Sequence, residues 1–336
     1  MNVDLRSINK CVRCGTCRSV CPIFEDSGWE SANTRGRIMI IKGLAEGREA
    51  DASAVDSLST CTTCGLCTEC CPAGVNPPEL IEASRRDLVS RGMVTERQAL
   101  LNRKVIESGN TFGEESDRLA WLQDRRPAVQ KSDYVYFVGC LASYRYPEIA
   151  ARTFEVLRRF GVALLPDEQC CGSPLMRTGF DYSRLKEHNI QQIRDMGAHT
   201  VITGCAGCYT ALKRYGCRDF RVVSVPEFLA EHLSELKLQP LDLKVTYHDP
   251  CHLGRHARVY DQPRQVIKAI CELEEMAANR SSSRCCGGGG GVRSGYGELS
   301  LRLAKKRLED VPGDVDYVVT SCPLCIRNLT DAGAEI

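Results

Sequence analysis

The chain has 336 residues, a formal net charge of +1, and 44 basic against 43 acidic side chains. This length allows two or three domains, and the balanced charge gives no sign of a nucleic-acid partner or an anionic membrane surface. Apolar runs such as YVYFVG are far too short to span a bilayer, and MNVDLRSINK lacks the apolar segment of a signal peptide, so we expect a cytoplasmic protein.

Cysteine is the unusual component of the chain, which contains 21 of them. In a small secreted protein, so many cysteines would indicate a disulfide framework. A chain of this length needs no such bridges and shows no export signal, so metal or redox chemistry is the better interpretation.

The first hundred residues contain the motif C-x2-C-x2-C-x3-C-P twice. This motif is typical of paired [4Fe–4S] cubanes, in which the fourth cysteine of each run binds the other cluster. One predicted cubane therefore has Cys11, Cys14, Cys17 and Cys71, and the other has Cys61, Cys64, Cys67 and Cys21. Two zinc knuckles are the alternative, but two matching runs that both end in proline favour the clusters. Cys70 is surplus and is expected to be a free thiol or a packing residue.

Between the two runs, the segment RGRIMIIKGLAEG predicts a helix that ends at Gly47. Such a long insert is unusual for a compact bacterial ferredoxin and suggests the helical ferredoxin type of respiratory iron–sulfur subunits. We therefore predict a helical ferredoxin domain over residues 1–91. Residues 92–132 are charged, helix-prone and free of cysteine, which indicates a helical connector.

From about residue 133 the chain repeats itself with a period of about 110 residues, which indicates two duplicated domains. The two repeats share a set of five cysteines in the same order. The first repeat, residues 133–236, has Cys140, Cys170, Cys171, Cys205 and Cys208, and the second, residues 237–336, has Cys251, Cys285, Cys286, Cys322 and Cys325.

The apolar segments of both repeats predict strands that lead into these cysteines. DYVYFVG is expected to end at Cys140, HTVITG at Cys205 and DYVVTS at Cys322, while PEIAARTFEVLRRFG predicts a helix with Gly161 past its end. Alternating strands and helices indicate a small α/β unit with a parallel sheet, whose strand ends are the usual place for ligands. Each C-x2-C pair is expected to open a helix, where thiolates are stabilised.

Two cysteines stand side by side in each repeat, in QCCGSPLMRTG and RCCGGGGGVRSG. In a tight loop, adjacent cysteines can hold two irons or bridge between them. The glycines let the backbone come close to a large inorganic group, and their N–H groups can donate to its sulfides or to an anion. A flexible loop with a vicinal disulfide is the alternative, but the upstream copy shares the cysteines rather than the glycines.

Several segments closely resemble the cysteine-rich "CCG" domain of heterodisulfide reductases and their relatives. They are VGCLASYRYPE, CCGSPLMRTG, YHDPCHLGRHARVYDQPRQVI, CCGGGGGVRSGYG and SCPLCIRNL. A helical ferredoxin domain ahead of two such domains is similar to the D subunit of that family, and the resemblance covers nearly the whole chain. The expected fold class is α/β, with a helical di-cluster ferredoxin domain followed by two duplicated α/β CCG domains with small parallel sheets.

The resemblance implies that each five-cysteine set holds a non-cubane [4Fe–4S] cluster, and all ten positions match. It implies an anaerobic disulfide-reducing enzyme of methanogenesis, in which the mixed disulfide of coenzyme M and coenzyme B lies between the two clusters. Electrons would arrive singly through the two cubanes. Disulfide reduction takes two electrons, and two one-electron centres can divide them. A redox partner is also implied, either a membrane cytochrome b or a flavoprotein, with peripheral attachment to the inner face of the membrane.

Other residues near the motifs are candidates for substrate contacts. The arginines close to the cysteine motifs could bind anionic groups of the substrate; they are Arg145, Arg177, Arg255 and Arg293. His252 and His256 flank Cys251 and could supply protons to product thiolates, with His252 as the first candidate. We expect His248 to be structural. Cys217 and Cys271 lie outside every motif, and Cys271 is expected in the core.

Two alternatives remain open on function. The chain could be an electron-relay subunit of a flavin dehydrogenase for lactate, glycolate or glycerol 3-phosphate, relatives that share this layout and the RGRI segment; two complete five-cysteine sets favour the reductase. A zinc-rich scaffold or redox sensor explains the N-terminal runs poorly. The second repeat ends soon after Cys325, without the final strand and helix that follow Cys208. We therefore expect a truncated or split domain, or one that a partner completes.

Overall fold

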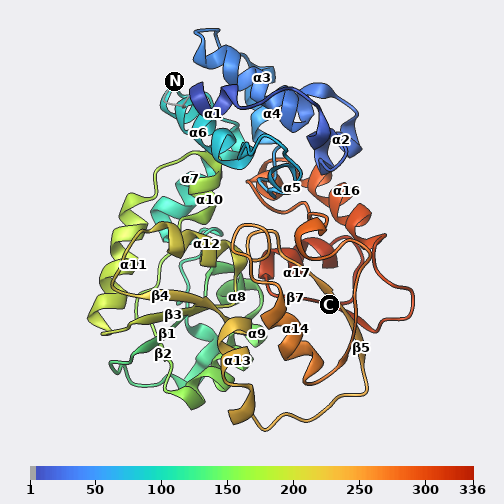
Figure 1. The fold of residues 1–336 in the computed structure, drawn as a ribbon. Coiled ribbons are helices and arrows are strands. Elements are labelled where there is room, and N and C mark those ends of the chain that lie inside the picture. The colour runs from blue at the N-terminus through green and yellow to red at the C-terminus, as the bar shows by residue number, and fades with distance from the viewer. Residues whose placement is uncertain (1–4) are drawn as a thin grey trace.

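The computed structural model describes residues 5–336, and its first part is a group of short helices at one end of the molecule (Figure 1). These are α1 (Leu5–Asn9), η1 (Thr16–Arg18), α2 (Pro22–Ser27), η2 (Glu30–Ala32), α3 (Thr34–Ala45), α4 (Ala52–Ser59), α5 (Leu66–Glu69) and α6 (Pro77–Ser90). The side chain of Asn33 caps α3 by accepting from the backbone N–H of Arg35 at 2.7 Å. Helix α3 ends at Ala45, two residues before the predicted Gly47, whose φ is 95°.

The connector contains one regular helix, α7 (Glu96–Ser108), and the short 3-10 helix η3 (Ala120–Arg125). Thr95 caps α7 through its hydroxyl, and Gly109 ends it with a φ of 68°. Between the two elements, residues 109–119 run as turns and irregular chain. This segment wraps against the first repeat, because the carbonyl oxygen of Gly109 accepts from the N–H of Cys170 at 2.7 Å.

The first repeat is built on a parallel sheet with the strand order β2-β1-β3-β4. Its elements are β1 (Tyr134–Phe137), α8 (Cys140–Arg145), α9 (Pro147–Leu157), η4 (Arg158–Phe160), β2 (Ala163–Leu164), α10 (Ser173–Thr178), α11 (Ser183–Asp195), β3 (Thr200–Thr203), α12 (Ala206–Arg214), β4 (Arg221–Ser224), α13 (Val225–Glu231) and η5 (Leu233–Glu235). Helices cover both faces, so the central strands β1 and β3 are almost entirely buried. Strand β1 ends earlier than predicted, because the chain turns at Gly139 (φ 81°) and Cys140 begins α8.

The second repeat has a parallel sheet of three strands in the order β6-β5-β7. Its elements are β5 (Lys244–His248), α14 (Asp261–Lys268), β6 (Glu272–Glu274), η6 (Arg280–Ser282), α15 (Val292–Gly295), α16 (Gly297–Leu308), β7 (Tyr317–Thr320) and α17 (Pro323–Thr330). Within residues 237–336, neither β4 nor α13 of the first repeat has a counterpart. Glu335 instead lies beside β7, where its carbonyl oxygen accepts from the N–H of Val318 at 3.0 Å.

The two repeats lie side by side, and the helical domain covers one end of both (Figure 1). One apolar cluster runs from the first repeat into the second, and it includes Cys171 and Cys208 together with Cys286 and Cys325. The cysteine-bearing ends of the two sheets therefore share one core. The predicted fold class, a helical ferredoxin domain followed by two α/β CCG domains with small parallel sheets, is confirmed. In residues 5–336, every helix is too short or too polar to cross a bilayer.

Candidate iron–sulfur and substrate site

The two five-cysteine sets face one cavity between the repeats, with a volume of about 360 Å³. Nine of the ten cysteines line it: Cys140, Cys170, Cys171, Cys205, Cys208, Cys251, Cys286, Cys322 and Cys325. The tenth, Cys285, is buried behind Cys286. The two sets also meet directly, because hydrogen bonds from Cys205 and then Cys325 hold the pKa of Cys322 well below its ordinary value. Parallel strands and duplicated topology thus bring both sets to the same place.

Local structure explains how the C-x2-C pairs reach the cavity. Cys205 and Cys322 have extended backbone angles and stand at the N-cap positions of α12 and α17. Cys208 and Cys325 follow one turn later, so each pair lies at a helix N-terminus, where partial positive charge favours thiolates. The sequence predicted that each pair opens a helix, and both helices begin where expected.

The crowding of these sulfurs fits a metal cluster better than a set of free thiols. The sulfurs of Cys286 and Cys325 are 3.3 Å apart, and hydrogen bonds from Cys170 and Cys208 lower the pKa of Cys171 to about 6. All 21 cysteines are free of disulfides, so the vicinal disulfide considered for the paired cysteines does not form. Thiolates packed together in a buried site are unfavourable unless a cation is shared among them. The donor set therefore suits iron–sulfur clusters.

The glycine run after Cys286 packs against the ferredoxin domain. A Cβ atom at Gly289 would lie 2.7 Å from the carbonyl oxygen of Thr62, and one at Gly290 would overlap the carbonyl oxygen of Cys61. Gly290 and Gly291 also have positive φ angles, 63° and 80°. The sequence explained the glycines by the approach of an inorganic group. The structure adds that they let two cysteine-bearing loops pack backbone to backbone.

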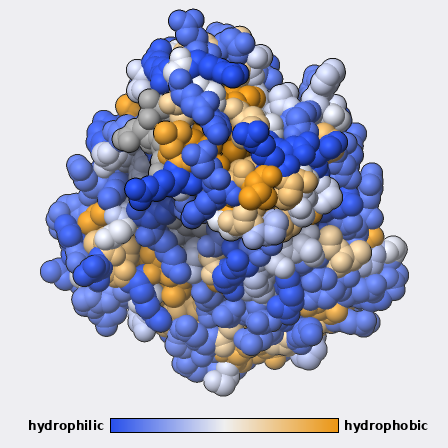
Figure 2. All heavy atoms as spheres, turned by 45° about the horizontal axis from the view of Figure 1, so that its top comes forward, coloured by the Kyte–Doolittle hydropathy of each residue, from blue (hydrophilic) through white to orange (hydrophobic). Residues whose placement is uncertain are grey.

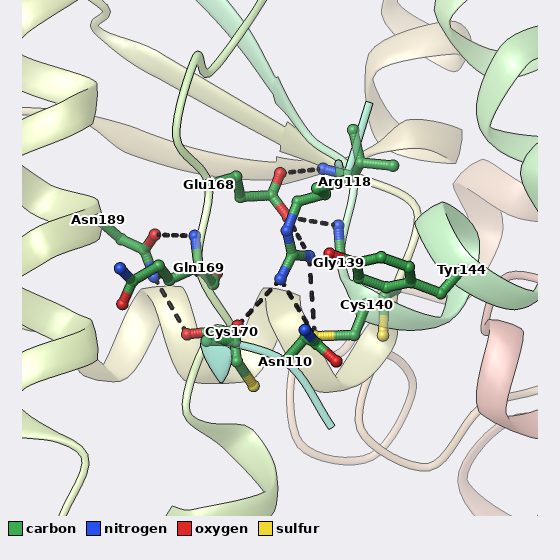
Figure 3. A network of polar contacts seen from close by, with 12 residues as sticks. Asn110, Arg118, Gly139, Cys140, Tyr144, Glu168, Gln169, Cys170 and Asn189 are labelled. Carbon is green, nitrogen blue, oxygen red and sulfur yellow. Dashed lines mark hydrogen bonds and ion pairs between the residues drawn. The ribbon is translucent and has the colours of Figure 1, made fainter. Parts of the chain in front are cut away.

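A buried ion pair supports the first five-cysteine set (Figure 3). The guanidinium of Arg118 donates to the sulfur of Cys140 from two nitrogens, at 3.6 and 3.7 Å, and to the carboxylate of Glu168 at 3.0 Å. Glu168 also accepts from the backbone N–H groups of Val138 and Gly139, at 2.6 and 2.8 Å. Glu168 therefore holds both the cation and the backbone that leads into Cys140.

The charges of this network stabilise one another. Burial opposes the positive charge of Arg118, but the negative charges of Cys140 and Glu168 outweigh burial and raise its pKa above the ordinary value. Burial raises the pKa of Glu168 to about 7, against the pull of Arg118 and the two backbone donors. Glu168 accepts every hydrogen bond that it makes in this network, so the geometry fits the ionised carboxylate rather than the protonated acid. Sequence reasoning missed both residues, because Arg118 belongs to the connector and contacts Glu168 only in the folded chain.

The ferredoxin cysteines form two groups. A small cavity is lined by Cys11, Cys14, Cys17, Cys67 and Cys71. Cys21 is buried elsewhere, close enough to Cys61 and Cys64 that their charges raise its pKa, after the larger effect of burial. The fourth cysteine of each run thus lies near the other run, while Cys67, which the sequence analysis assigned to the second cubane, also borders the first cavity.

The second group of ferredoxin cysteines touches the second CCG site. Cys64, Cys251 and Cys285 pack in one buried cluster, and a hydrogen bond to Cys285, followed by burial, raises the pKa of Cys64 well above its ordinary value. Arg255 lies between them and donates to the carbonyl oxygen of Cys64 at 2.7 Å. Arg85 ties the same junction together, since it donates to the carbonyl oxygens of Cys61, Arg177 and Gly290.

The four arginines predicted to bind anions have different surroundings. Arg145 is half-exposed, pairs with Glu114 at 2.8 Å and lies outside the cavity lining. Arg177 reaches the cavity but is buried in an ion pair with Glu82 of the ferredoxin domain.

Arg255 is outside the cavity lining, because its guanidinium bonds backbone carbonyl oxygens. Arg293 lines the cavity and pairs with Asp331. Sequence reasoning missed Arg327, which also lines the cavity and lies 4.0 Å from the same Asp331.

The three candidate histidines are all buried or nearly so. His252 lines the cavity, its Nδ1 lies 3.5 Å from the sulfur of Cys251, and burial lowers its pKa well below the ordinary value. His256 stacks edge-on against His252 with ring centroids 4.7 Å apart, and its Nε2 bonds the carbonyl oxygen of Thr63 at 2.8 Å. Burial lowers the pKa of His256 to about 4. His248 ends strand β5 and is buried.

The remaining cysteines lie away from the cavity. Cys70 bonds the carbonyl oxygen of Cys67 at 3.6 Å. Cys217 packs at the edge of the shared core. Cys271 follows α14 rather than lying on it and is half-buried at the edge of an apolar cluster near β5, so its expected place in the core is only partly realised.

Comparison with known proteins agrees with this geometry. The family model for a cysteine-rich domain matches residues 134–213 and 245–330, and the model for a 4Fe-4S dicluster domain matches residues 7–75. The D subunit of dihydromethanophenazine:CoB–CoM heterodisulfide reductase from Methanosarcina barkeri is 35% identical, over 98% of this chain and 90% of that protein. The B subunit of fumarate reductase (CoM/CoB) from Methanothermobacter marburgensis is also 35% identical, over 98% of this chain and 69% of that one.

A more distant relative is EtfAB:quinone oxidoreductase from Syntrophomonas wolfei, 27% identical over 98% of this chain and 55% of the relative. No solved structure matches significantly. These similarities support 4Fe-4S binding and an oxidoreductase role. The chain therefore belongs to the family of iron–sulfur oxidoreductase subunits that includes the D subunit of heterodisulfide reductase, with a 4Fe-4S dicluster domain ahead of two cysteine-rich domains.

Proposed function

We propose that the chain is a catalytic subunit that reduces a thiol heterodisulfide of the coenzyme M–coenzyme B type. The observation that carries this proposal is the one cavity faced by both complete five-cysteine sets. A protein that only relays electrons needs its clusters in a row, whereas a shared cavity suits a bond whose two sulfurs are to be separated. The reaction consumes the disulfide, two electrons and two protons and yields two thiols.

The cofactors in this proposal are two cubane and two non-cubane [4Fe–4S] clusters. The cubanes use Cys11, Cys14, Cys17 and Cys71, and Cys61, Cys64, Cys67 and Cys21. The non-cubane clusters use Cys140, Cys170, Cys171, Cys205 and Cys208, and Cys251, Cys285, Cys286, Cys322 and Cys325. When bound, these groups would supply the electrons one at a time.

We propose that electrons enter at the ferredoxin domain and leave it toward the second repeat. Cys14 is exposed at the surface of the ferredoxin domain, beside Val12, whose exposed fraction is 68%. Apolar side chains lie among charged ones on the face of the molecule shown in Figure 2. At the other end of the domain, Cys64 packs against Cys285. We therefore place the redox partner, a membrane cytochrome b or a flavoprotein, near Cys14.

The cavity walls fit an anionic substrate with an apolar body. Leu101, Phe112 and Leu324 are among the apolar residues that line it. Apart from the cysteines, the charged side chains among its described lining residues are arginines, and Arg293 and Arg327 lie near the same carboxylate. We assign them to the substrate's anionic groups.

Protons must reach the two product thiolates. His252 lines the cavity next to Cys251 and remains the proposed donor on that ground. His256 stands one ring farther from the cavity, in contact with a polar cleft that also borders the ferredoxin domain.

The test is anaerobic oxidation of a reduced viologen by the reconstituted chain, started by adding coenzyme M–coenzyme B heterodisulfide. We expect rapid oxidation that is lost when Cys171 or Cys286 is changed to Ala. The matched control is Cys271→Ala, which removes a thiol outside both sets and should keep the activity. Absence of oxidation in a chain with its full iron content would contradict the proposal.

A second candidate function is an electron-relay subunit of a flavin dehydrogenase complex. The contact between Cys64 and Cys285 favours it, because a continuous row of clusters serves transfer in either direction. In that case a reduced flavoprotein would reduce the clusters, while the heterodisulfide would leave them reduced.

A further inference from the structure

His248 is held in one tautomer by a buried arginine. Its Nδ1 accepts a hydrogen bond from Nε of Arg307 at 3.0 Å. An arginine can only donate hydrogen bonds, so Nδ1 carries no proton. An imidazolium would need a proton on both ring nitrogens, so a ring that accepts at Nδ1 is neutral. A neutral imidazole with a bare Nδ1 carries its proton on Nε2.

The arginine that fixes this tautomer is itself firmly placed. Arg307 is buried and donates to the carbonyl oxygen of Ala278 and the carboxylate of Asp310, both at 2.8 Å. Breaking its bond to His248 would remove a partner from a buried cation, which is costly. The orientation of the imidazole is thus set through the hydrogen bond at its Nδ1 atom.

The ring also lies beside the second five-cysteine set. A ring nitrogen of His248 and the sulfurs of Cys286 and Cys325 all lie within 4.8 Å of one another. The Nε2 atom is buried and has no partner among the described residues. Two cysteines and a histidine at this spacing could be taken for three metal ligands. A nitrogen that carries a proton has no lone pair for a metal, so the tautomer argues against ligation by Nε2.

We propose that His248 is a positioning residue that donates its Nε2–H to a sulfur of the iron–sulfur group held by the second set, and that it is not an iron ligand. An N–H donor stabilises the extra negative charge of a reduced cluster and raises its reduction potential. His248 stands three residues before Cys251. The equivalent position in the first repeat, three residues before Cys140, is Phe137, so this histidine donor is specific to the second set.

The inference rests on the proposed function only in requiring a cluster at the second set. It is tested on the full reconstituted chain by a redox titration followed by electron paramagnetic resonance, with iron content and nitrogen hyperfine coupling measured on the same samples. The variants are His248→Phe, which copies the first repeat, and His248→Gln, which keeps an N–H donor. The matched control is His199→Phe, the same change at the opposite end of the first sheet, where the side chain is exposed.

We expect His248→Phe to keep its iron while one cluster signal shifts to lower potential. His248→Gln should shift less, and His199→Phe should not shift. A strong nitrogen coupling in the wild type, or iron lost in both His248 variants, would show ligation and overturn the inference. Unchanged potentials in His248→Phe would also overturn it. Failure of the disulfide assay with these shifts present would contradict the proposed function and leave the donor role standing.

Discussion

Gly290 packs against Cys61 so closely that a Cβ atom at the glycine would overlap the carbonyl oxygen of the cysteine. Arg85 bonds both backbones, with 2.7 Å to the carbonyl oxygen of Cys61 and 2.9 Å to that of Gly290. A cysteine-bearing loop of the ferredoxin domain and the paired-cysteine loop of the second repeat are thereby locked together. The spacing between the cysteines of these two loops is therefore set by main-chain contacts rather than by flexible side chains.

Gly290→Ala is expected to destabilise the chain by about 2 kcal/mol or more, because it adds a positive-φ penalty to a clash with fixed backbone. Chemical denaturation of the reconstituted protein measures this loss. Gly313→Ala is the matched control, since an added Cβ there meets nothing within 4 Å. Equal stabilities of the two variants would contradict the packing described for this loop.

Arg118→Met should lower the reduction potential of the cluster at the first set, because it removes a cation that donates to the sulfur of Cys140. It also leaves Glu168 buried without its partner, which costs about 3–5 kcal/mol of stability. The double variant Arg118→Met, Glu168→Gln should recover part of that stability while the potential stays low.

The measurements for Arg118 are a redox titration followed by electron paramagnetic resonance and a denaturation curve. Arg145→Met is the control, since this half-exposed arginine pairs with Glu114 outside the cavity. A potential that does not change in Arg118→Met would show that its guanidinium serves folding alone.

Arg293→Met and Arg327→Met should each raise the KM for the heterodisulfide roughly 10-fold to 100-fold, as expected for loss of one charge-assisted hydrogen bond, with kcat nearly unchanged. Steady-state kinetics with reduced viologen measures both constants. Arg152→Met is the control, because this arginine side chain is 84% exposed. Its KM and kcat should equal those of the wild type. An equal KM in all four proteins would remove these arginines from substrate binding.

Glu82→Gln should weaken the junction between the ferredoxin domain and the first repeat. Glu82 pairs with Arg177 and with Arg214, the latter at 2.7 Å. Loss of its charge leaves buried Arg177 without its ion-pair partner, which should lower the stability of the fold by about 3–5 kcal/mol. Burial opposes the charge of Glu82, but the two arginines outweigh it and hold its pKa below the ordinary value.

The stability from Glu82 should therefore depend on pH with a definite sign. A depressed folded-state pKa means that the contribution is complete above the unfolded value of about 4.3 and falls as pH drops through the folded value. Denaturation curves from pH 8 to pH 4 give the free energy of unfolding of both proteins. The difference between wild type and Glu82→Gln should stay constant over most of this range and become smaller only at the acid end. Glu79→Gln, an exposed change on the same helix, is the control, and a gap that widens in acid would refute the assignment.

Local patterns were enough to predict much of the fold. The spacing of the cysteines indicated two dicluster runs and two five-cysteine sets, and the apolar runs indicated the parallel strands that lead into them. Errors occurred at element ends. Strand β1 stops at Phe137 because Gly139 turns the chain, and Cys140 starts a helix instead of ending a strand. Such ends depend on a single backbone angle, which apolar periodicity does not encode.

The sequence by itself determined which cysteines are candidates for binding iron, because ligand type and spacing are local properties of the chain. Only the tertiary structure decided that both five-cysteine sets face one cavity, that Arg118 meets Cys140, and that the glycine run meets Cys61. These contacts join segments far apart in the sequence, and burial and backbone packing fix them only after the domains assemble. Of the four arginines named from the sequence, Arg177 and Arg293 line the cavity and the other two do not, while Arg327, only two residues after Cys325, was recognised only in the fold.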